Sequence, residues 1–240
     1  MSFYAEDLAY IHDVGFGGFA RDAAPALLHM MGAAGVERGL VVDLGCGSGI
    51  WARALISARY EALGVDVSAA MIEFARRCVP RARFVRASLH QVKLPRCVCV
   101  TAIGECFNYT SEQAGGDSLR QTFRRVFRAL VPGGLLIFDM AVPARALEPS
   151  RKHLQGKDWA VLLEVSSDPI RNSLERRITA FRRVGNLYRR SEEVHRLQLW
   201  PRAVIARELR LAGFRVRVLH GYGSVKFPAG IAGFLARKPA

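Results

Sequence analysis

The segment VVDLGCGSG at 41–49 and the acidic residue Asp66 carry the clearest binding chemistry in this sequence. The apolar start of the segment predicts a buried strand, and its glycines predict a sharp turn whose backbone a ligand can approach closely. Asp66 lies at the end of the next predicted strand, 61–67, and parallel strands present their carboxyl ends at one edge of a sheet. A carboxylate there can accept hydrogen bonds from both hydroxyls of a ribose. The pattern therefore predicts a nucleoside site at this turn.

Two other nucleotide-binding motifs fit the turn less well. A dinucleotide fingerprint, GxGxxG, needs its last glycine where this chain has Ile50, and the third glycine stands at 49 instead. A P-loop needs Gly-Lys-Ser/Thr, which this turn lacks.

An acidic residue followed by GxGxG resembles the first motif of class I S-adenosylmethionine-dependent methyltransferases. The segments VVDLGCGSG, GVDVS, LVPGGLLIFDM, LRLAGFRV and GFLARKP follow the order found in that family, from residue 39 to the end apart from one insertion. The resemblance implies that S-adenosylmethionine is the cofactor. A glycine-rich turn in another doubly wound fold is the alternative interpretation.

The resemblance also implies roles for single residues. The three glycines would line the methionine portion of the cofactor, Asp43 would support their loop, and Asp66 would hold the ribose. Val67 would cover the adenine and Ser88-Leu89 would meet its edge, although many relatives have aspartate where Ser88 stands. The predicted cofactor residues are Asp43, Gly45, Cys46, Gly47, Gly49, Trp51, Asp66, Val67, Ser88, Leu89 and Ile103.

Residues for the methyl acceptor are less distinctive, because an in-line methyl transfer depends mainly on positioning and needs a base only when the nucleophile loses a proton. The segment AIGECFNYT at 102–110 resembles the family's acceptor-side motif in position and offers Glu105, Asn108 and Tyr109. It lacks the Asp/Asn-Pro-Pro-aromatic tetrapeptide typical of enzymes that methylate nucleic-acid amino groups. A methyltransferase that acts on pyrimidine C5 would need a nucleophilic cysteine. Cys97 and Cys99 lie in apolar strand sequence, where a cysteine is more often a buried thiol than a reactive one.

Two further segments supply candidate acceptor residues. His12 lies in a glycine-containing N-terminal stretch that could form a lid. The histidine could act there as a base, or it could be an ordinary turn or capping histidine. Glu193 and His195 share one face of a predicted strand. They could contact the acceptor, or they could form a simple ion pair on an edge strand. The predicted catalytic residues are His12, Glu105, Tyr109, Glu193 and His195, and no metal site is predicted.

The elements that must position these residues alternate between strand and helix. Strands are predicted at 39–45, 61–67, 82–88, 97–104, 135–140, 214–220 and 230–238, and the helix before the fifth is expected to close at Gly133-Gly134. This alternation predicts an α/β, doubly wound fold with a mostly parallel seven-stranded sheet. Segments 158–165, 173–184 and 186–200 have period two and Gly185-Asn186 suits a hairpin, which predicts an antiparallel β insertion after the fifth strand.

Three parts are therefore expected along the chain. Residues 1–38 would form an N-terminal helical cap or lid, and 39–144 with 201–240 would form the Rossmann-like cofactor domain. Residues 145–200 would form the insertion over the acceptor site.

Composition narrows the classes of function. Of the 240 residues 50% are hydrophobic and 23% charged, which is typical of a packed globular protein. The N-terminus is acidic and the chain has no long apolar run, so we expect no signal peptide and no membrane partner. The five cysteines include no CxxC pair, which favours free thiols in the cytoplasm. The net charge of +14 indicates either an arginine-rich solvated surface or an anionic partner, so nucleic acid is possible but not favoured.

The main interpretation is a methyltransferase that acts on a small-molecule acceptor by in-line displacement. The sequence allows a homodimer. The alternatives are an RNA or protein methyltransferase and a non-catalytic nucleotide-binding protein of the same fold. The acceptor and the atom methylated do not follow from the sequence.

Overall fold

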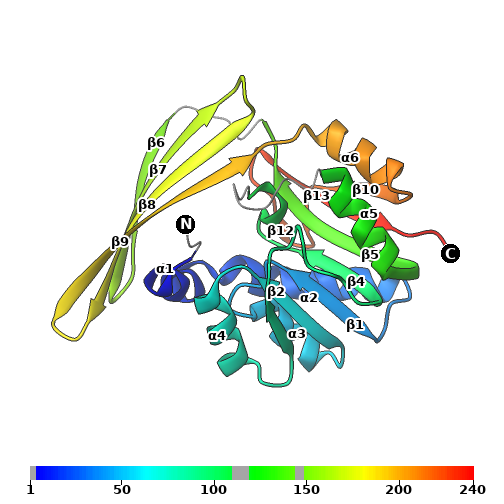
Figure 1. The fold of residues 1–240 in the computed structure, drawn as a ribbon, viewed down its shortest axis with the longest axis horizontal. Helices are drawn as coiled ribbons and strands as arrows, with labels where there is room; N and C mark the ends of the chain where they lie inside the picture. The colour runs from blue at the N-terminus through cyan, green and yellow to red at the C-terminus, as the bar shows by residue number, and fades with distance from the viewer. Residues whose placement is uncertain (1–3, 110–118, 144–148) are drawn as a thin grey trace.

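A twisted central sheet forms the middle of the molecule, and a second, curved sheet projects from it as an arm (Figure 1). The computed structural model describes residues 4–109, 119–143 and 149–240. Residues 1–3 of the expected cap and the expected boundary between 144 and 145 lie outside the described residues.

The central sheet has seven strands in the order β10-β13-β5-β4-β1-β2-β3. Strands β1 to β5 are mutually parallel, and β13 runs antiparallel to both β5 and β10. The predicted mostly parallel, seven-stranded sheet is therefore confirmed. The strands are β1 (Leu40–Leu44), β2 (Glu61–Asp66), β3 (Arg83–Arg86), β4 (Cys97–Ala102), β5 (Leu130–Ala141), β10 (Arg215–Leu219) and β13 (Ile231–Arg237).

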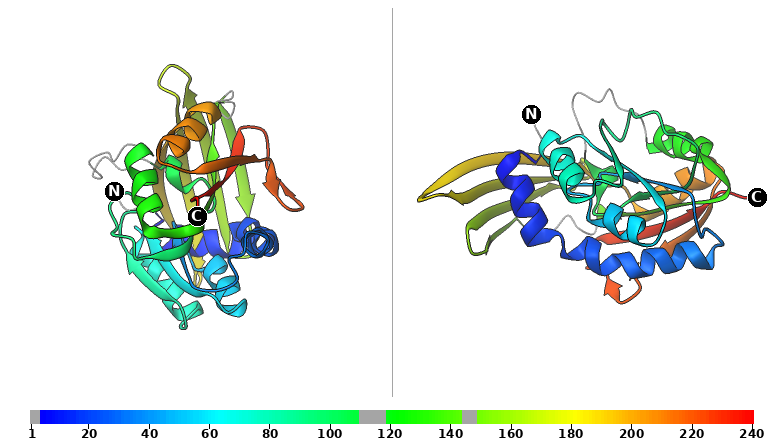
Figure 2. Two further views of the ribbon diagram at one scale, coloured as in Figure 1. Left: turned by 90° about the vertical axis from the view of Figure 1, so that its right-hand side faces the viewer. Right: turned by 90° about the horizontal axis from the view of Figure 1, so that it is seen from below.

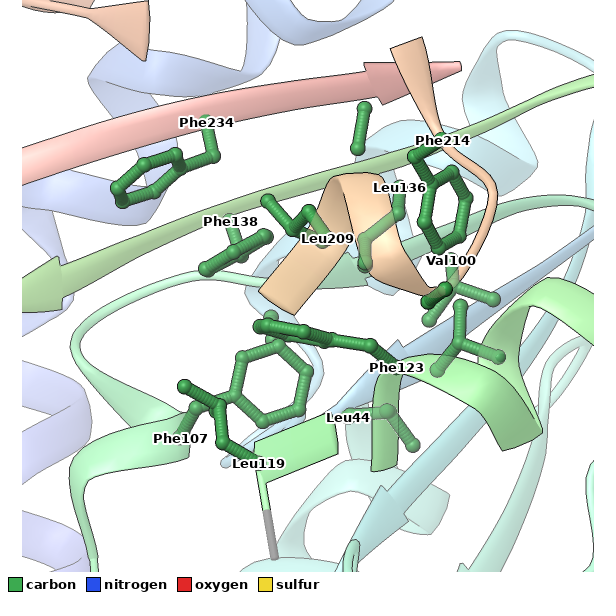
Figure 3. Close-up of a cluster of buried hydrophobic side chains, with 14 of the residues drawn as sticks. Leu44, Val100, Phe107, Leu119, Phe123, Leu136, Phe138, Leu209, Phe214 and Phe234 are labelled. Carbon is green, nitrogen blue, oxygen red and sulfur yellow. The ribbon is translucent and has the colours of Figure 1, made fainter. Parts of the chain in front are cut away.

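Helices cover both faces of this sheet because successive residues of its buried strands point to opposite sides. Leu44 and Phe138 pack against α5 and α6 on one face, where Phe138 stacks on Phe234 at 5.0 Å between ring centroids (Figure 3). Val41 and Ile137 pack against α2, α3 and α4 on the other face. The helices are α1 (Glu6–Ile11), α2 (Gly18–Ala33), α3 (Ile50–Ser57), α4 (Ala69–Cys78), α5 (Leu119–Ala129) and α6 (Arg202–Leu211), with a π-helical turn η1 (His12–Phe16) and a short 3-10 helix η2 (Cys106–Asn108).

Helix α5 ends earlier than the sequence predicts. Its last residue is Ala129, and Leu130 already pairs with Cys97 as the start of β5, so Gly133-Gly134 lie inside the strand. Lys238 closes the helix instead, because its Nζ donates to the carbonyl oxygens of Phe127 and Leu130 at 2.9 and 2.7 Å. None of the described helices is long and apolar enough to cross a membrane.

The arm is an antiparallel sheet that follows β5 in the chain, which confirms the predicted insertion. Its strands are β6 (Ser150–Gln155), β7 (Trp159–Asp168), β8 (Ser173–Val184) and β9 (Leu187–Gln198). Gly185 has a φ of +63° in the turn between β8 and β9, as the Gly-Asn pair predicted. The sequence prediction missed β6 because this edge strand is exposed and carries no apolar alternation. It also missed a small hairpin of β11 (Gly221–Tyr222) and β12 (Val225–Lys226).

Helix α1 attaches the arm to the rest of the chain and lies across it in Figure 2. Leu8 and Ile11 of α1 pack against Val161 and Ala180 on the inner face of the arm. Asp7 forms ion pairs with Arg182 and Arg189 beside this contact. The N-terminal segment is thus held between the arm and the central sheet.

Candidate active site

A cavity of about 330 Å³ opens at the carboxyl ends of β1, β2 and β4. This is the edge at which open parallel sheets bind ligands. All predicted cofactor residues except Gly49 line it: Asp43, Gly45, Cys46, Gly47, Trp51, Asp66, Val67, Ser88, Leu89 and Ile103. Gly49 instead permits close packing behind the loop, because a Cβ there would stand 3.1 Å from the Phe84 ring and 3.3 Å from Cβ of Ala75.

The glycine loop bends tightly over the end of β2. The amides of Gly45 and Cys46 both donate to the carbonyl oxygen of Val65, at 2.7 and 3.0 Å. Gly45 has a φ of +75°, and a Cβ at this residue would stand 2.5 Å from Sγ of Cys106. Gly47 has a φ of +52°, and its side facing the cavity has no heavy atom closer than Sδ of Met71 at 4.0 Å. The loop therefore needs glycine both for its backbone and for the space beside it.

Asp66 connects this loop to the start of α4. Its Oδ2 accepts from the Gly47 amide and its Oδ1 from the Ser68 amide, both at 2.9 Å. Ser68 in turn caps α4 by accepting from the Met71 amide at 3.1 Å. Burial raises the pKa of Asp66, and the backbone amides oppose that shift. Asp66 also lines the cavity, and a carboxylate oxygen can accept more than one hydrogen bond.

Asp43 lies deeper, at the end of a short hydrogen-bond chain. The Trp51 indole donates to Oγ1 of Thr101 at 3.0 Å, and this hydroxyl donates to Oδ1 of Asp43 at 2.8 Å. Burial raises the pKa of Asp43 to about 7, with a further contribution from the charge of Asp66. A cation in the cavity would favour the ionised form of Asp43.

Asp139, which the sequence analysis did not select, organises the segment that follows β4. Its carboxylate accepts from the amides of Gly104 and Glu105 at about 3 Å and from the Tyr222 hydroxyl at 3.0 Å. These bonds hold Glu105 at a φ of +65°, in the left-handed region. Burial raises the pKa of Asp139 to about 6. The sequence did contain a signal for this role, because Asp139 is an acidic residue near the end of the apolar fifth strand.

One part of the cavity wall is aromatic and contains two of the predicted catalytic residues. His12 and Tyr109 line it together with Tyr4, whose hydroxyl lies 3.2 Å from that of Tyr109. The rings of Tyr4 and His12 meet edge to face, 5.0 Å apart. Burial raises the pKa of both tyrosine hydroxyls, so they stay protonated at neutral pH.

His12 has an unsatisfied polar atom in this wall. Within residues 4–109, 119–143 and 149–240 its buried Nδ1 has no hydrogen-bond partner. Burial lowers the pKa of His12 to about 4, and the charge of Asp13 opposes the shift. The imidazole is therefore neutral at physiological pH and can accept a hydrogen bond or a proton.

The other predicted catalytic residues lie behind the cavity wall. Glu105 forms an ion pair with Arg176 of β8, at 2.7 Å. Glu193 accepts from backbone amides of the N-terminal segment, and His195 packs its ring against Tyr4 and Tyr109 at 4.9 and 5.6 Å. None of the three is among the described residues that line the cavity.

Asn108 also serves the structure rather than the cavity. Its side chain donates to the carbonyl oxygens of Ala141 and Gln198 and accepts from the Ala141 amide. It thereby joins the segment after β4 to the end of β5 and to β9. Tyr4 and His90 also line the cavity, and Arg176 pairs with Glu105 behind its wall. None of the three was predicted, because only the fold brings them to these places.

Residues 41–134 match the family model of a methyltransferase domain. The chain is 24% identical over 188 residues to the putative methyltransferase YqeM of Bacillus subtilis (strain 168), an alignment that covers 75% of each protein. It is 33% identical over 123 residues to a trans-aconitate 2-methyltransferase of Paracidovorax citrulli (strain AAC00-1), covering 48% of this chain but only 43% of that protein.

Solved structures resemble the whole chain. An S-adenosylmethionine-dependent methyltransferase from Clostridium acetobutylicum ATCC 824 superposes with a TM-score of 0.82 at 17% identity and covers 97% of this chain and 98% of its own. CalS10, an amino pentose methyltransferase of Micromonospora echinaspora solved with S-adenosylmethionine bound, gives a TM-score of 0.75 at 17% identity over 99% of both chains. At these identities the likeness shows a shared fold.

Proposed function

We propose that this chain, a class I S-adenosylmethionine-dependent methyltransferase, transfers the methyl group to a small molecule whose reacting N–H or O–H group points at His12. The observation that carries the proposal is a single cavity lined by both Asp66 and His12, with Nδ1 of His12 buried and without a hydrogen-bond partner in the part of the chain that the structure describes. A buried nitrogen without a partner costs free energy unless a ligand supplies the missing donor.

The residues of the loop fit the cofactor. Gly47 and Gly104 both line the cavity and leave open the space that a Cβ would fill, so a ligand can contact the backbone there. The free lone pairs of Asp66 would accept from the ribose hydroxyls, and Ser88 and Leu89 would border the adenine. When bound, S-adenosylmethionine supplies a methyl group on a positively charged sulfur, which a nucleophile displaces in line.

The aromatic wall would orient the acceptor. Neutral His12 accepts a hydrogen bond from the reacting N–H or O–H group and takes its proton when the nucleophile must lose one. The protonated hydroxyls of Tyr4 and Tyr109 can donate to polar groups beside it. Glu105 and His195 would act on the acceptor only indirectly, through the wall that they support.

A small acceptor agrees with the names of several similar proteins. The trans-aconitate enzyme, the amino pentose enzyme CalS10 and the sugar N-methyltransferase KedS8 all act on small molecules by name. We also propose that residues 1–38 cap the cavity and that the insertion, residues 145–200, covers the acceptor side. A cytoplasmic location and a homodimer stay predictions.

The test is a methyl-transfer screen with S-adenosylmethionine against small amines, alcohols and carboxylic acids, with bulk RNA and protein as parallel acceptors. We expect turnover on a small molecule and a fall in kcat of about 100-fold or more in His12→Ala, the usual range for losing a general base. His29→Ala, on the exposed side of α2, is the matched control and should not change kcat. Turnover on RNA or protein alone would contradict the proposed acceptor class.

A further inference from the structure

Tyr4 adopts a backbone conformation that a bulky residue rarely takes. Its φ is +50°, in the left-handed region that favours glycine. Such a conformation persists only where the surroundings hold it, and it is commonly found at functional sites. Tyr4 also lines the cavity, so the contacts that hold it determine the shape of the wall.

Three other segments hold the polar groups of Tyr4. Its amide donates to Oε2 of Glu193 on β9 at 2.7 Å, and its carbonyl oxygen accepts from Oγ of Ser68 at 2.7 Å. Its hydroxyl lies 3.2 Å from that of Tyr109. The Ser68 amide donates to Asp66, so a chain of hydrogen bonds runs from the arm through Tyr4 to the predicted ribose carboxylate.

Glu193 has three hydrogen bonds and is nearly shielded from water, with a side chain only 8% exposed. Oε1 accepts from the Ala5 amide at 2.7 Å, and Oε2 lies 2.8 Å from Nε2 of His195. Two adjacent backbone amides on one carboxylate make a strong, directional attachment, because charge-assisted hydrogen bonds are short and specific. Such a carboxylate is suited to holding a segment in place.

We propose that Glu193 is a positioning residue that holds Tyr4 over the cavity, so that the cofactor leaves only after this contact opens. The inference rests on the proposed placement of the cofactor in the cavity, and Glu193 acts through Tyr4 rather than on a reacting atom. Helix α1 begins at Glu6, two residues after Tyr4, and packs on the arm, so opening the contact would release the start of this helix.

The test measures release of S-adenosylhomocysteine by stopped flow, and hydrogen exchange at the start of α1, in Glu193→Ala and Glu193→Gln. Gln has nearly the same shape but places an NH₂ group against a backbone donor, so a packing role would survive this change and the positioning role would not. We expect at least about tenfold faster release in both variants, since charge-assisted bonds are lost. Exchange of the Tyr4 and Ala5 amides should also be faster.

Glu192→Gln is the matched control, because Glu192 lies next in the chain, is exposed and pairs with Arg190. Its release rate should equal that of the unchanged protein. The double variant Tyr4→Ala/Glu193→Ala should release no faster than Tyr4→Ala alone. The backbone amide at position 4 still donates to Glu193 in Tyr4→Ala, but Glu193 acts on release only through the Tyr4 side chain, which both variants lack.

Two results would overturn the inference: release and exchange unchanged in both Glu193 variants, or effects of Tyr4→Ala and Glu193→Ala that simply add. If instead the unchanged protein bound no S-adenosylhomocysteine, the placement of the cofactor itself would be wrong. Normal binding with unaltered release in the variants would contradict only the role of Glu193.

Discussion

At the scale of single residues, three carboxylates lie in or behind the cavity wall. Asp43 of β1 and Asp66 of β2 line the cavity, whereas Asp139 of β5 lies behind the wall and holds the backbone of Gly104. Burial raises the pKa of all three carboxyl groups. Backbone amides or a hydroxyl donate to each carboxylate, but none of the three forms an ion pair within the described part of the chain. A positively charged ligand would stabilise their ionised forms, which suits a sulfonium cofactor.

Replacing Asp66 should weaken the binding of the cofactor without unfolding the protein. In Asp66→Ala we expect S-adenosylhomocysteine to bind about 1.5–3 kcal/mol more weakly, since hydrogen bonds to a charged acceptor are lost. Isothermal titration calorimetry measures this change, and Asp22→Ala, on the exposed side of α2, is the control. An unchanged dissociation constant in folded Asp66→Ala would show that Asp66 does not hold the ribose.

Asp43 should make stability depend on pH. Its pKa is about 7 in the folded protein against 3.8 for the free side chain, so the folded state holds a proton that the unfolded state has released. Stability of the cofactor-free protein is therefore lost through this group as the pH rises from about 4 to 7. Asp43→Asn removes this loss and can still accept from Thr101.

The measurement is the Tm of Asp43→Asn minus that of the unchanged protein, taken at pH 5 and at pH 8. We expect this difference to be larger at pH 8. His12, whose lowered pKa makes stability rise with pH, contributes equally to both proteins and cancels. A difference that stays constant would contradict the raised pKa of Asp43.

At the scale of elements, the two faces of the arm differ. The inner face buries Val161, Leu174 and Ala180 against α1 and the end of the central sheet. The outer face carries exposed pairs such as Arg196 with Glu175, and exposed ion pairs contribute little to stability. The tip of the hairpin, with Leu187 77% exposed, extends beyond these contacts.

Shortening this tip should therefore leave the cavity intact. Deleting Arg183, Val184, Leu187 and Tyr188 keeps the Gly185-Asn186 turn. Because two residues are removed from each strand, all remaining side chains stay on the same face of the sheet. Arg182 and Arg189 would then flank the turn and still reach Asp7. We expect affinity for S-adenosylhomocysteine to stay within about threefold, or 0.7 kcal/mol, by calorimetry. A larger loss would show that the tip contributes to the site.

At the scale of the whole molecule, the cavity brings together residues from segments that are distant in sequence. The glycine loop belongs to the central sheet, Tyr4 and His12 to the N-terminal segment, and Tyr109 to the segment held by β5 and β9. A ligand that fills the cavity contacts all of these segments at once, and it can bind only the folded chain. Cofactor binding should therefore stabilise the entire fold.

S-Adenosylhomocysteine at 100 times its dissociation constant should stabilise the protein by about 2.7 kcal/mol. For a chain of this size that corresponds to a rise in Tm of roughly 5–10 °C. Differential scanning fluorimetry measures the shift, and NAD at the same concentration is the control ligand. An equal shift with NAD would contradict the specificity of the site.

The sheet, the glycine loop and Asp66 could all be predicted from the sequence alone. Their signals are local, because strands buried on both faces need continuous apolar runs and a turn with positive φ needs glycine within a few residues. The order of βα units then restricts the topology to a few arrangements. The same local rules identified the hairpin at Gly185-Asn186, but they missed β6, whose exposed side chains carry no pattern.

The contacts that build the aromatic part of the cavity wall could be seen only in the folded protein. Glu193 holds an amide 189 residues away, and Arg176 pairs with a carboxylate 71 residues away. No periodicity predicts such contacts, because a charged residue on a strand looks the same whether it faces water or a buried backbone amide. The direction of each side chain follows from how the arm curves over α1, and that depends on packing between segments distant in sequence.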